Sequence, residues 1–562
     1  MNRLLAAAIA VLVTAGLSLT AMGSAGAASD PGWNGSVPFT NVVASSPTTG
    51  GGYPVPPGSR VPVAGTCREG PFNANHSESW LSVKPGTENL VGTSKFFFDK
   101  FSTFYMFYNG AYQILSGTPS GNNQVQGYDC ISTGTQDMPP SWTNTTDPNS
   151  DFDTQGRVYQ TMLPYNSFFD ATRLHPDGEI DVSYSDDLGR QWVQGNGGKP
   201  LEPSNNASAK QAGHVEDKQW IAVNHIVGNR FQDHVYAAWA VFNGSSNGQG
   251  IKVRMAVSRD RGSTFAKAVT IAPPSQVSAG ATFVYPSIDA AGNVYVAVVS
   301  FPPAKGSIST IYVARSTDDA KTFSAFVPIT TVNTAPGLPN TRFRDGITES
   351  FAASPTYPNH LYLTYEDWDV AAGQMDVKFT QSNDGGVTWT KPAVVNDNLD
   401  PPGAPTDQFQ PSVAAGPNGA VAIAFYDRRE ACPNDPSVLP ADVGRTNFCI
   451  DTSLQAYKDS GSGAALVGTN VRISEFAWDP EQPGQHLGGL SQYPCAGARD
   501  PCPNGSGFIG DYFGLAISAG NIYALMVSTH YPSNVTADEG GPIYYQQQLL
   551  ATVPRGSFGA SY

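Results

Sequence analysis

The octet SNDGGVTW at residues 382–389 gathers a Ser, an Asp, two Gly and an aromatic residue in one short stretch. The same pattern recurs as SDDLGRQW at 185–192, SRDRGSTF at 258–265 and STDDAKTF at 316–323, where Ala320 takes the Gly position. Ser and Asp oxygens accept backbone N–H bonds inside turns, and Gly supplies a positive φ. The octets therefore predict hairpin turns, with the closing aromatic packed between sheets. A phosphate loop is excluded because no Lys-Ser/Thr pair and no helical pattern follows.

A strand, a Gly/Pro/Asn turn and a second strand precede each octet, and the same unit occurs where the octet is absent. The octets begin at residues 185, 258, 316 and 382, a spacing that suits a four-stranded blade. We therefore predict an all-β fold, a β-propeller of four-stranded antiparallel blades, with seven blades favoured and six as the alternative. No helical patterns alternate with the strands, which disfavours a parallel sheet. The seven units begin at Glu78, Asp151, Gln219, Pro286, Glu349, Pro411 and Gly510.

The N-terminus is typical of a secretory signal peptide over residues 1–28. A short cationic start is followed by an apolar run at 4–19 and by the small residues Ala25 and Ala27. We expect a secreted, extracellular protein with no membrane segment after the signal is removed, because no later segment is apolar enough to span a bilayer. Residues 29–66 form an N-terminal segment whose stretch from Val37 could complete the last blade. Residues 67–553 form the propeller, and 554–562 a C-terminal tail.

Charge and cysteine content narrow the class of protein. The formal net charge is −15, and no basic stripe is present, which argues against nucleic acid and anionic membranes as partners. An even number of six cysteines in an exported chain favours disulfides. We expect the pairs Cys432–Cys449, Cys495–Cys502 and Cys67–Cys130.

Strand order predicts which face carries a site. If the strands of a blade are called a to d, each octet joins c to d, so the d-to-a and b-to-c loops share the opposite face, called here the rim face. Ligands are expected there, near the central axis. The a strands start with carboxylates, which either cap turns and anchor blades or converge in a cluster with raised pKa values suited to acid/base chemistry. They are Glu78, Asp147, Asp217, Asp345, Asp407 and Asp511.

The b-to-c loops add aromatic and charged residues to the rim face. YEDW at 365–368 includes Trp368, and YDRR at 426–429 includes Arg428. Such a mixture suits sugar binding, although a solvated rim of Arg–Asp pairs is as common. No HExxH or EF-hand pattern occurs. We expect no cofactor, with structural calcium left open because carboxylates and carbonyls suit it.

The octets resemble the Asp-box (BNR) repeats of sialidases and related secreted propellers, over about residues 78–553. The resemblance implies the propeller fold, and its family includes catalytic and non-catalytic members. Sialidases hold an anionic substrate with three Arg and use a Tyr nucleophile paired with a Glu, together with an Asp acid/base.

Several residues are similar to these family positions. Arg60 in RVP resembles the first Arg, Arg342 or Arg344 the second, and Arg428 or Arg429 the third. Tyr512 is the Tyr candidate, with Glu349 or Glu366 beside it. No Asp follows Arg60 at the family's usual distance, and an acidic rim is a poor host for an anion unless the Arg residues converge.

The sequence therefore predicts a monomeric sialidase-like propeller, a glycoside hydrolase or other enzyme acting on a glycan or glycoconjugate. The alternatives are a non-catalytic propeller that binds glycan or protein, and a scaffold with a plugged channel. The catalytic candidates are Tyr512, Asp511, Glu349, Asp147 and Asp217. The substrate-binding candidates are Arg344, Arg428, Arg60, Asp345, Asp407 and Trp368.

Overall fold

The structure is a computed structural model of the 562-residue chain. It describes residues 39–45, 75–97, 107–124, 144–166, 177–203, 214–243, 251–272, 281–300, 308–341, 343, 345–346, 349–400, 402–430, 446–480, 508–536, 542–544 and 546–562. The predicted signal peptide lies outside these residues. Within them, no helix is long and apolar enough to cross a membrane.

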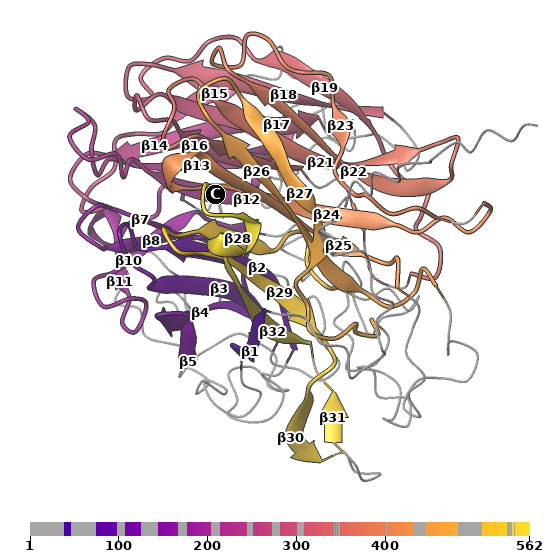
Figure 1. The fold of residues 1–562 in the computed structure, drawn as a ribbon. Coiled ribbons are helices and arrows are strands. Elements are labelled where there is room, and N and C mark those ends of the chain that lie inside the picture. The colour runs from indigo at the N-terminus through magenta and orange to yellow at the C-terminus, as the bar shows by residue number, and fades with distance from the viewer. Residues whose placement is uncertain are drawn as a thin grey trace, which may run out of the picture.

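Seven antiparallel sheets follow one another around a ring, in chain order (Figure 1). Neighbouring inner strands contact each other around the ring, and β28 contacts β2, which closes it. The prediction of a β-propeller with seven four-stranded blades is confirmed.

The first three blades are built from strands β2 to β15. Blade 1 contains β2 (Asn75–Val83), β3 (Leu90–Phe97), β4 (Phe107–Leu115) and β5 (Thr118–Gln124). In blade 2, the inner position is divided between β6 (Asn144–Thr146) and β7 (Asp151–Phe152), which both pair with β8 (Val158–Asn166). On its other side β8 pairs with the short β9 (Asp177–Gly178) and with β10 (Asp181–Ser185), and β11 (Val193–Gln194) is the outer strand. Blade 3 contains β12 (His214–Val223), β13 (Val235–Asn243), β14 (Lys252–Ser258) and β15 (Val269–Ala272).

The remaining blades repeat the same order. Blade 4 contains β16 (Ala281–Ile288), β17 (Val294–Ser300), β18 (Ile308–Ser316) and β19 (Val327–Asn333). Blade 5 contains β20 (Glu349–Ala353), β21 (Leu361–Asp369), β22 (Gln374–Ser382) and β23 (Ala393–Val394). Blade 6 contains β24 (Gln408–Ala415), β25 (Ala420–Asp427), β26 (Asp451–Asp459) and β27 (Ala464–Arg472). Blade 7 contains β28 (Gly514–Ile517), β29 (Asn521–Ser528), β32 (Gln547–Pro554) and β1 (Thr40–Val43).

The two ends of the chain meet in blade 7. The N-terminal strand β1 pairs antiparallel with β32, from Thr40 opposite Thr552 to Val43 opposite Leu549. The segment that follows Val37 in the sequence thus provides the outer strand that blade 7 otherwise lacks. A hairpin of β30 (Pro532–Thr536) and β31 (Pro542–Tyr544) projects from the ring between β29 and β32 (Figure 1).

The four octets fold into one repeated turn between the third and fourth strands of blades 2 to 5. In each, the Ser hydroxyl donates to the Asp carboxylate at 2.8–2.9 Å and accepts the N–H of the fifth octet residue at 2.8–3.0 Å. That fifth residue is left-handed, with φ of 81° at Gly189, 80° at Gly262, 56° at Ala320 and 88° at Gly386. The side chains replace backbone hydrogen bonds that the tight turn cannot make.

Buried tyrosines tie adjacent blades together near the octet face. The hydroxyl of Tyr236 in blade 3 donates to Asp319 of blade 4 at 2.8 Å, and Tyr362 of blade 5 donates to Asp459 of blade 6 at 2.6 Å. The ring closes the same way, since Tyr523 of blade 7 donates to Glu88 of blade 1 at 2.7 Å. These bonds to charged acceptors fix the blades at one end of the channel.

An irregularity in the inner strands shapes the other end. Glu78, Asp147, Lys218, Phe283 and Gln410 have φ between 45° and 56°, a left-handed conformation unusual for residues with a Cβ. In four of these five blades the register between the first two strands shifts at this point. Bulges of this kind redirect side chains.

Of the six cysteines, Cys449 alone falls in the described part of the chain, where it is buried and not free. The other five lie outside the described residues. The three disulfide pairings therefore stay predictions.

Replacing Ala320 tests the turn. Ala at φ 56° is strained, so we expect Ala320→Gly to raise the free energy of unfolding by about 0.5 kcal/mol, since relief of strain exceeds the entropy that Gly loses. The reverse change, Gly386→Ala, should lower it by about 1–2 kcal/mol, because its Cβ would also lie 3.1 Å from Val313 Cγ1. Urea denaturation measures the free energy of unfolding of both variants. If both substitutions changed it equally and in the same direction, this account would be contradicted.

Candidate functional site

Lys218 lies at the centre of a charged cluster where four blades converge. Its Nζ is 2.9 Å from Asp511 Oδ2 of blade 7, 3.6 Å from Asp147 Oδ2 of blade 2 and 4.0 Å from Glu78 Oε1 of blade 1. The side chain is only 11% exposed, and the carboxylates hold the pKa of Lys218 well above its usual value despite burial. One buried ammonium group thus neutralises acids from three other blades.

Asp147 and Asp217 form a hydrogen-bonded carboxyl pair beside this ammonium. Burial, and then the charge of Asp147, raises the pKa of Asp217 to about 7. Burial would also raise the pKa of Asp147, but Lys218 and Lys95 outweigh it and lower that pKa. Below about pH 7 Asp217 holds a proton, which it donates to ionised Asp147 in a hydrogen bond. Asp217 is only partly buried, so it is the member of the pair nearer to solvent.

Glu78 lies deeper in the cluster and is 1% exposed. It forms an ion pair with Lys95 of β3, whose Nζ also lies 4.7 Å from the ring centre of Phe508. Burial raises the pKa of Glu78 to about 7, against the opposing effect of Lys95.

Blade 5 contributes two further acids to the channel mouth. Glu349 is fully buried, neither carboxyl oxygen has a hydrogen-bond partner in another described residue, and burial raises its pKa well above normal. Asp345 is partly buried. Burial, followed by the charges of Asp407 and Asp511, raises the pKa of Asp345 to about 8.

Aromatic side chains pack against one another next to the charged cluster. Trp220 packs edge-on against Trp80, Tyr285 and Tyr512, with ring centroids 4.6, 4.8 and 5.0 Å away. The hydroxyl of Tyr512 donates to the carbonyl of Pro148 at 3.2 Å, and burial raises the pKa of Tyr512 well above normal. In this structure Tyr512 packs within the aromatic floor of the site.

Arg428 is fully buried, and its guanidinium holds loops. Its donors bond to the carbonyls of Pro339, Asn340 and Phe448 and to the Thr341 hydroxyl, at 2.8–3.1 Å, which uses all five N–H groups. Asp407 Oδ2 lies 3.9 Å from Nη1. Asp407 itself accepts the backbone N–H of Met375 at 3.0 Å.

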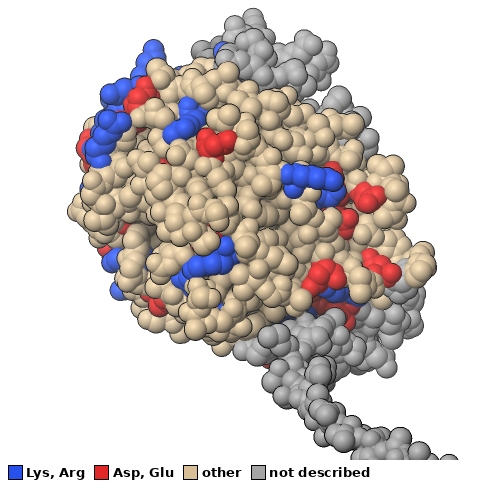
Figure 2. Space-filling model, turned by 45° about the horizontal axis from the view of Figure 1, so that its top comes forward, with Lys and Arg blue, Asp and Glu red and all other residues tan. Residues whose placement is uncertain are grey.

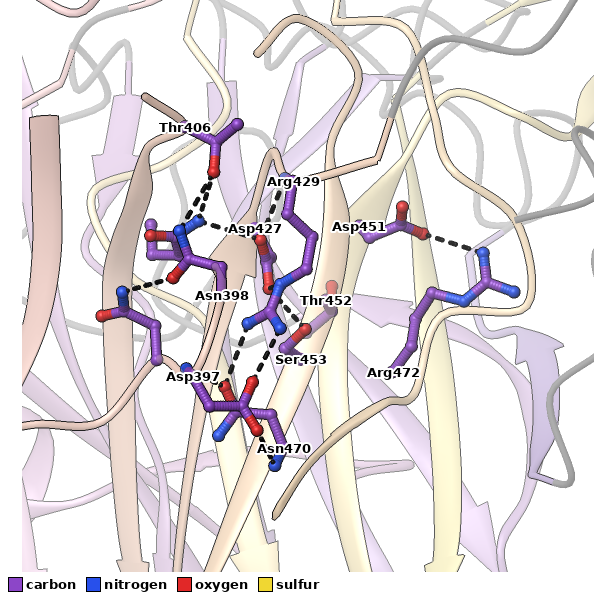
Figure 3. Close-up of polar contacts among 12 residues, drawn as sticks. Asp397, Asn398, Thr406, Asp427, Arg429, Asp451, Thr452, Ser453, Asn470 and Arg472 are labelled. Atoms are coloured by element: carbon purple, nitrogen blue, oxygen red, sulfur yellow. Dashed lines mark hydrogen bonds and ion pairs between the residues drawn. The ribbon is translucent and has the colours of Figure 1, made fainter. Parts of the chain in front are cut away.

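The alternative clamp, Arg429, points into a polar network between blades 5 and 6 (Figure 3). It bonds Asp427 and Asp397, each at 2.7 Å, and Asn470 at 3.0 Å. Trp368 is half-buried, lies opposite Met375 of β22 and packs against the core. Glu366 accepts the N–H of Gln410 at 2.8 Å.

The structure thus brings together Asp147, Asp217 and Asp511, with Glu349, Asp345 and Tyr512 nearby. It places Arg428, Asp407 and Trp368 in loop and core contacts. Arg60, Arg342 and Arg344 lie outside the described residues, so an arginine clamp stays a prediction. No group of three or more His, Cys, Asp or Glu in the described part of the chain is arranged to hold a metal ion.

Sequence reasoning missed the two lysines. Lys218 directly follows Asp217, at a repeat position where other units carry an acid. A lysine there is a usable signal for a cation that several blades share. Lys95 has no such signal, because it comes from the second strand of blade 1.

No protein-family model matches the sequence, and no curated protein is significantly similar to it. Among solved structures, the chain is similar to a Hadza microbial sialidase, Hz136, with 13% identity, a TM-score of 0.39 and 84% of this chain and 77% of that chain covered. It is similar to the α-L-arabinofuranosidase Arb93A of Fusarium graminearum, with 11% identity, a TM-score of 0.37 and 73% and 93% covered. It is also similar to the NanB sialidase of Streptococcus pneumoniae, with 9% identity, a TM-score of 0.37 and 84% of each chain covered. Such values do not assign a reaction.

Removing the central ammonium tests its role. Lys218→Met leaves buried carboxylates uncompensated, so we expect the free energy of unfolding at pH 7 to fall by about 3–5 kcal/mol. Lys458→Met is the matched control, because Lys458 donates to the Asn418 carbonyl at an exposed site, and it should lose less than about 0.5 kcal/mol. Equal losses in urea denaturation would refute the central role of Lys218.

The raised pKa of Asp217 predicts a pH-dependent stability difference. Its folded pKa of about 7 exceeds its ordinary value of 3.8, so its contribution to stability is lost as pH rises through about 7. Asn cannot ionise, so the melting temperature of Asp217→Asn minus that of the wild type should increase from pH 5 to pH 8. Asp384→Asn is the control. Because the pKa of Asp384 is lowered, the difference in melting temperature between this variant and the wild type should stay constant over that range. A flat difference for Asp217→Asn would contradict the shift.

Proposed function

We propose that this protein is an extracellular glycan-active enzyme, a propeller glycoside hydrolase whose acid/base chemistry lies at the channel mouth. The observation that carries the proposal is the Asp147–Asp217 pair, in which pKa values move in opposite directions beside one shared ammonium. Separated pKa values in neighbouring carboxyls are how sites assign an acid and its ionised partner. Glycoside hydrolysis uses a protonated carboxylic acid and a separate ionised carboxylate, and we assign these roles to Asp217 and Asp511.

Asp217 is the general acid in this scheme. It keeps its proton near neutral pH and, as the partly buried member of the pair, transfers it to the leaving oxygen as the glycosidic bond breaks. Asp147 holds the acid in position and stays ionised. Asp511, ion-paired with Lys218 at 2.9 Å, is the base that takes a proton from the water attacking the anomeric carbon. The products are the free sugar and the released alcohol.

This scheme differs from the tyrosine chemistry that the octet resemblance implies. We assign Tyr512 to the aromatic floor, because its hydroxyl donates to the Pro148 carbonyl and its ionisation is disfavoured. We assign Arg428 to positioning the loops at 339–341 and 448, because its donors are used there. An anionic substrate would then depend on Arg60 and Arg344.

Burial favours a second candidate, a non-catalytic propeller that binds glycan at its rim. Glu78 is 1% exposed, Asp147 2% and Asp511 6%, and aromatic rings pack against one another beside them. In that case the cluster holds the blades together, and the half-buried rim residues make the contacts. The two candidates share the expected secretion, monomeric state and glycan partner.

A panel of fluorescent aryl glycosides, including a sialoside and an arabinofuranoside, separates the candidates. We expect release from at least one, with activity falling as pH rises through about 7 because Asp217 loses its proton. Asp217→Asn should lower kcat/KM about 10²–10⁴-fold for a poor leaving group and far less for a dinitrophenyl glycoside, which needs no protonation.

Tyr512→Phe is the matched variant, because it removes one hydroxyl from the aromatic floor and keeps the ring. It should retain activity under carboxyl chemistry and lose it if Tyr512 is the nucleophile. No release from any sugar by folded protein, together with glycan-array binding, would replace the enzyme by the binding propeller.

A further inference from the structure

The channel mouth combines a solvent-reachable edge with a buried acidic interior. Asp217, Lys218, Phe283 and Asp345 are partly buried and form the edge. Beneath them lie Glu78, Asp147, Glu349 and Asp511, all buried. Of the described residues in this cluster, six bear carboxyl groups and two, Lys95 and Lys218, bear ammonium groups. The face of the molecule in Figure 2, by contrast, carries its charges in small groups of both signs.

The two ammonium groups, of Lys95 and Lys218, already form ion pairs with particular acids. Lys218 lies closest to Asp511 and Asp147, and Lys95 pairs with Glu78. Asp217, Asp345 and Glu349 are left with raised pKa values, which reflects burial in all three and nearby acids in two of them. Lys218 acts on Glu349 and Arg428 acts on Asp345, but burial outweighs both cations and the pKa values of the two acids stay raised.

Glu349 independently indicates a missing partner. It is fully buried on the inner strand β20, and both of its carboxyl oxygens lack a hydrogen-bond partner in another described residue. Its charge acts on Tyr285, which packs on Trp220 in the floor of the site. Buried carboxyl oxygens are rarely left without a partner, because desolvation is then uncompensated. Asp345 Oδ1 is also buried without one.

A ligand that suits this arrangement donates hydrogen bonds and carries positive charge. An ammonium group at Glu349 or Asp345 would supply hydrogen-bond donors and would relieve the repulsion that Asp407 and Asp511 exert on Asp345, whereas an anion would increase that repulsion. Phe283 offers a half-buried ring at the edge, and Lys218 Nζ already lies 4.8 Å from its centroid, so this ring face tolerates a cation.

We propose that the mouth recognises a sugar residue bearing a free amino group, a hexosamine without its N-acetyl group, with Glu349 and Asp345 as the specificity-determining residues. This inference rests on the proposed glycan-directed function and names the class of sugar. The ammonium group replaces the proton that the acids on the blade 5 side otherwise retain.

Calorimetry on the full mature chain tests the proposal with a glucosamine tetramer and its N-acetylated counterpart as probes. We expect the free-amine tetramer to bind at least about tenfold more tightly than the N-acetylated one. Glu349→Gln and Asp345→Asn, which keep side-chain size, should each reduce that ratio severalfold. Because the ratio compares two ligands on one variant, loss of folded protein cannot mimic the effect.

Three outcomes overturn the inference: equal binding of the two tetramers, a ratio unchanged in both variants, or tighter binding of a sialoside than of the amine. The proposed hydrolysis is measured separately. Turnover of a neutral or sialylated glycoside without amine preference would remove this inference and keep the enzyme. Amine-selective binding without turnover of any glycoside would keep the inference and remove catalysis.

Discussion

The ring depends on one electrostatic constraint: acids from several inner strands must be neutralised where the strands converge. Lys218 provides this neutralisation, because carboxylates of blades 1, 2 and 7 lie within 4.0 Å of its Nζ. Glu78, Asp147 and Lys218, whose side chains form the cluster, all have the left-handed backbone conformation. Backbone strain of about 1–2 kcal/mol at each such residue is offset by the ion pairs that it permits.

The opposite end of the channel is held by different interactions. Octet turns there are stabilised by their own Ser and Asp side chains, and buried tyrosines bridge blades to carboxylates such as Asp319 and Asp459. These acids have lowered pKa values because donors surround them. At the mouth, Asp217 is partly buried, Glu349 is fully buried, and burial with fewer hydrogen-bond donors raises both pKa values. Aspartate is thus held ionised by its donors at one end, whereas Asp217 has a pKa of about 7 at the other.

Much of the fold could be predicted from sequence because its signals are local. An octet specifies its turn through hydrogen bonds between residues two to four positions apart, and four copies in register predict blades. The site was less accessible. Asp147, Asp217 and Asp511 were predicted from their repeat position, but the bulges occur at Glu, Lys, Phe and Gln, which carry no glycine signal. The contacts of Arg428 come from carbonyls near residue 340, almost ninety positions away, and no local pattern predicts them.

The burial of the charged cluster does not by itself show that its role is only structural. Replacing a buried ion cluster with apolar side chains of similar volume is often neutral or stabilising, so holding blades together does not require acids. The aromatic floor of Trp80, Trp220 and Tyr285 shows that this channel accommodates apolar packing directly beside the charges. A purely structural plug could continue that packing to the mouth. Acids with opposite pKa shifts lie here instead, Asp217 partly buried and Asp147 buried, which favours a chemical role for the pair.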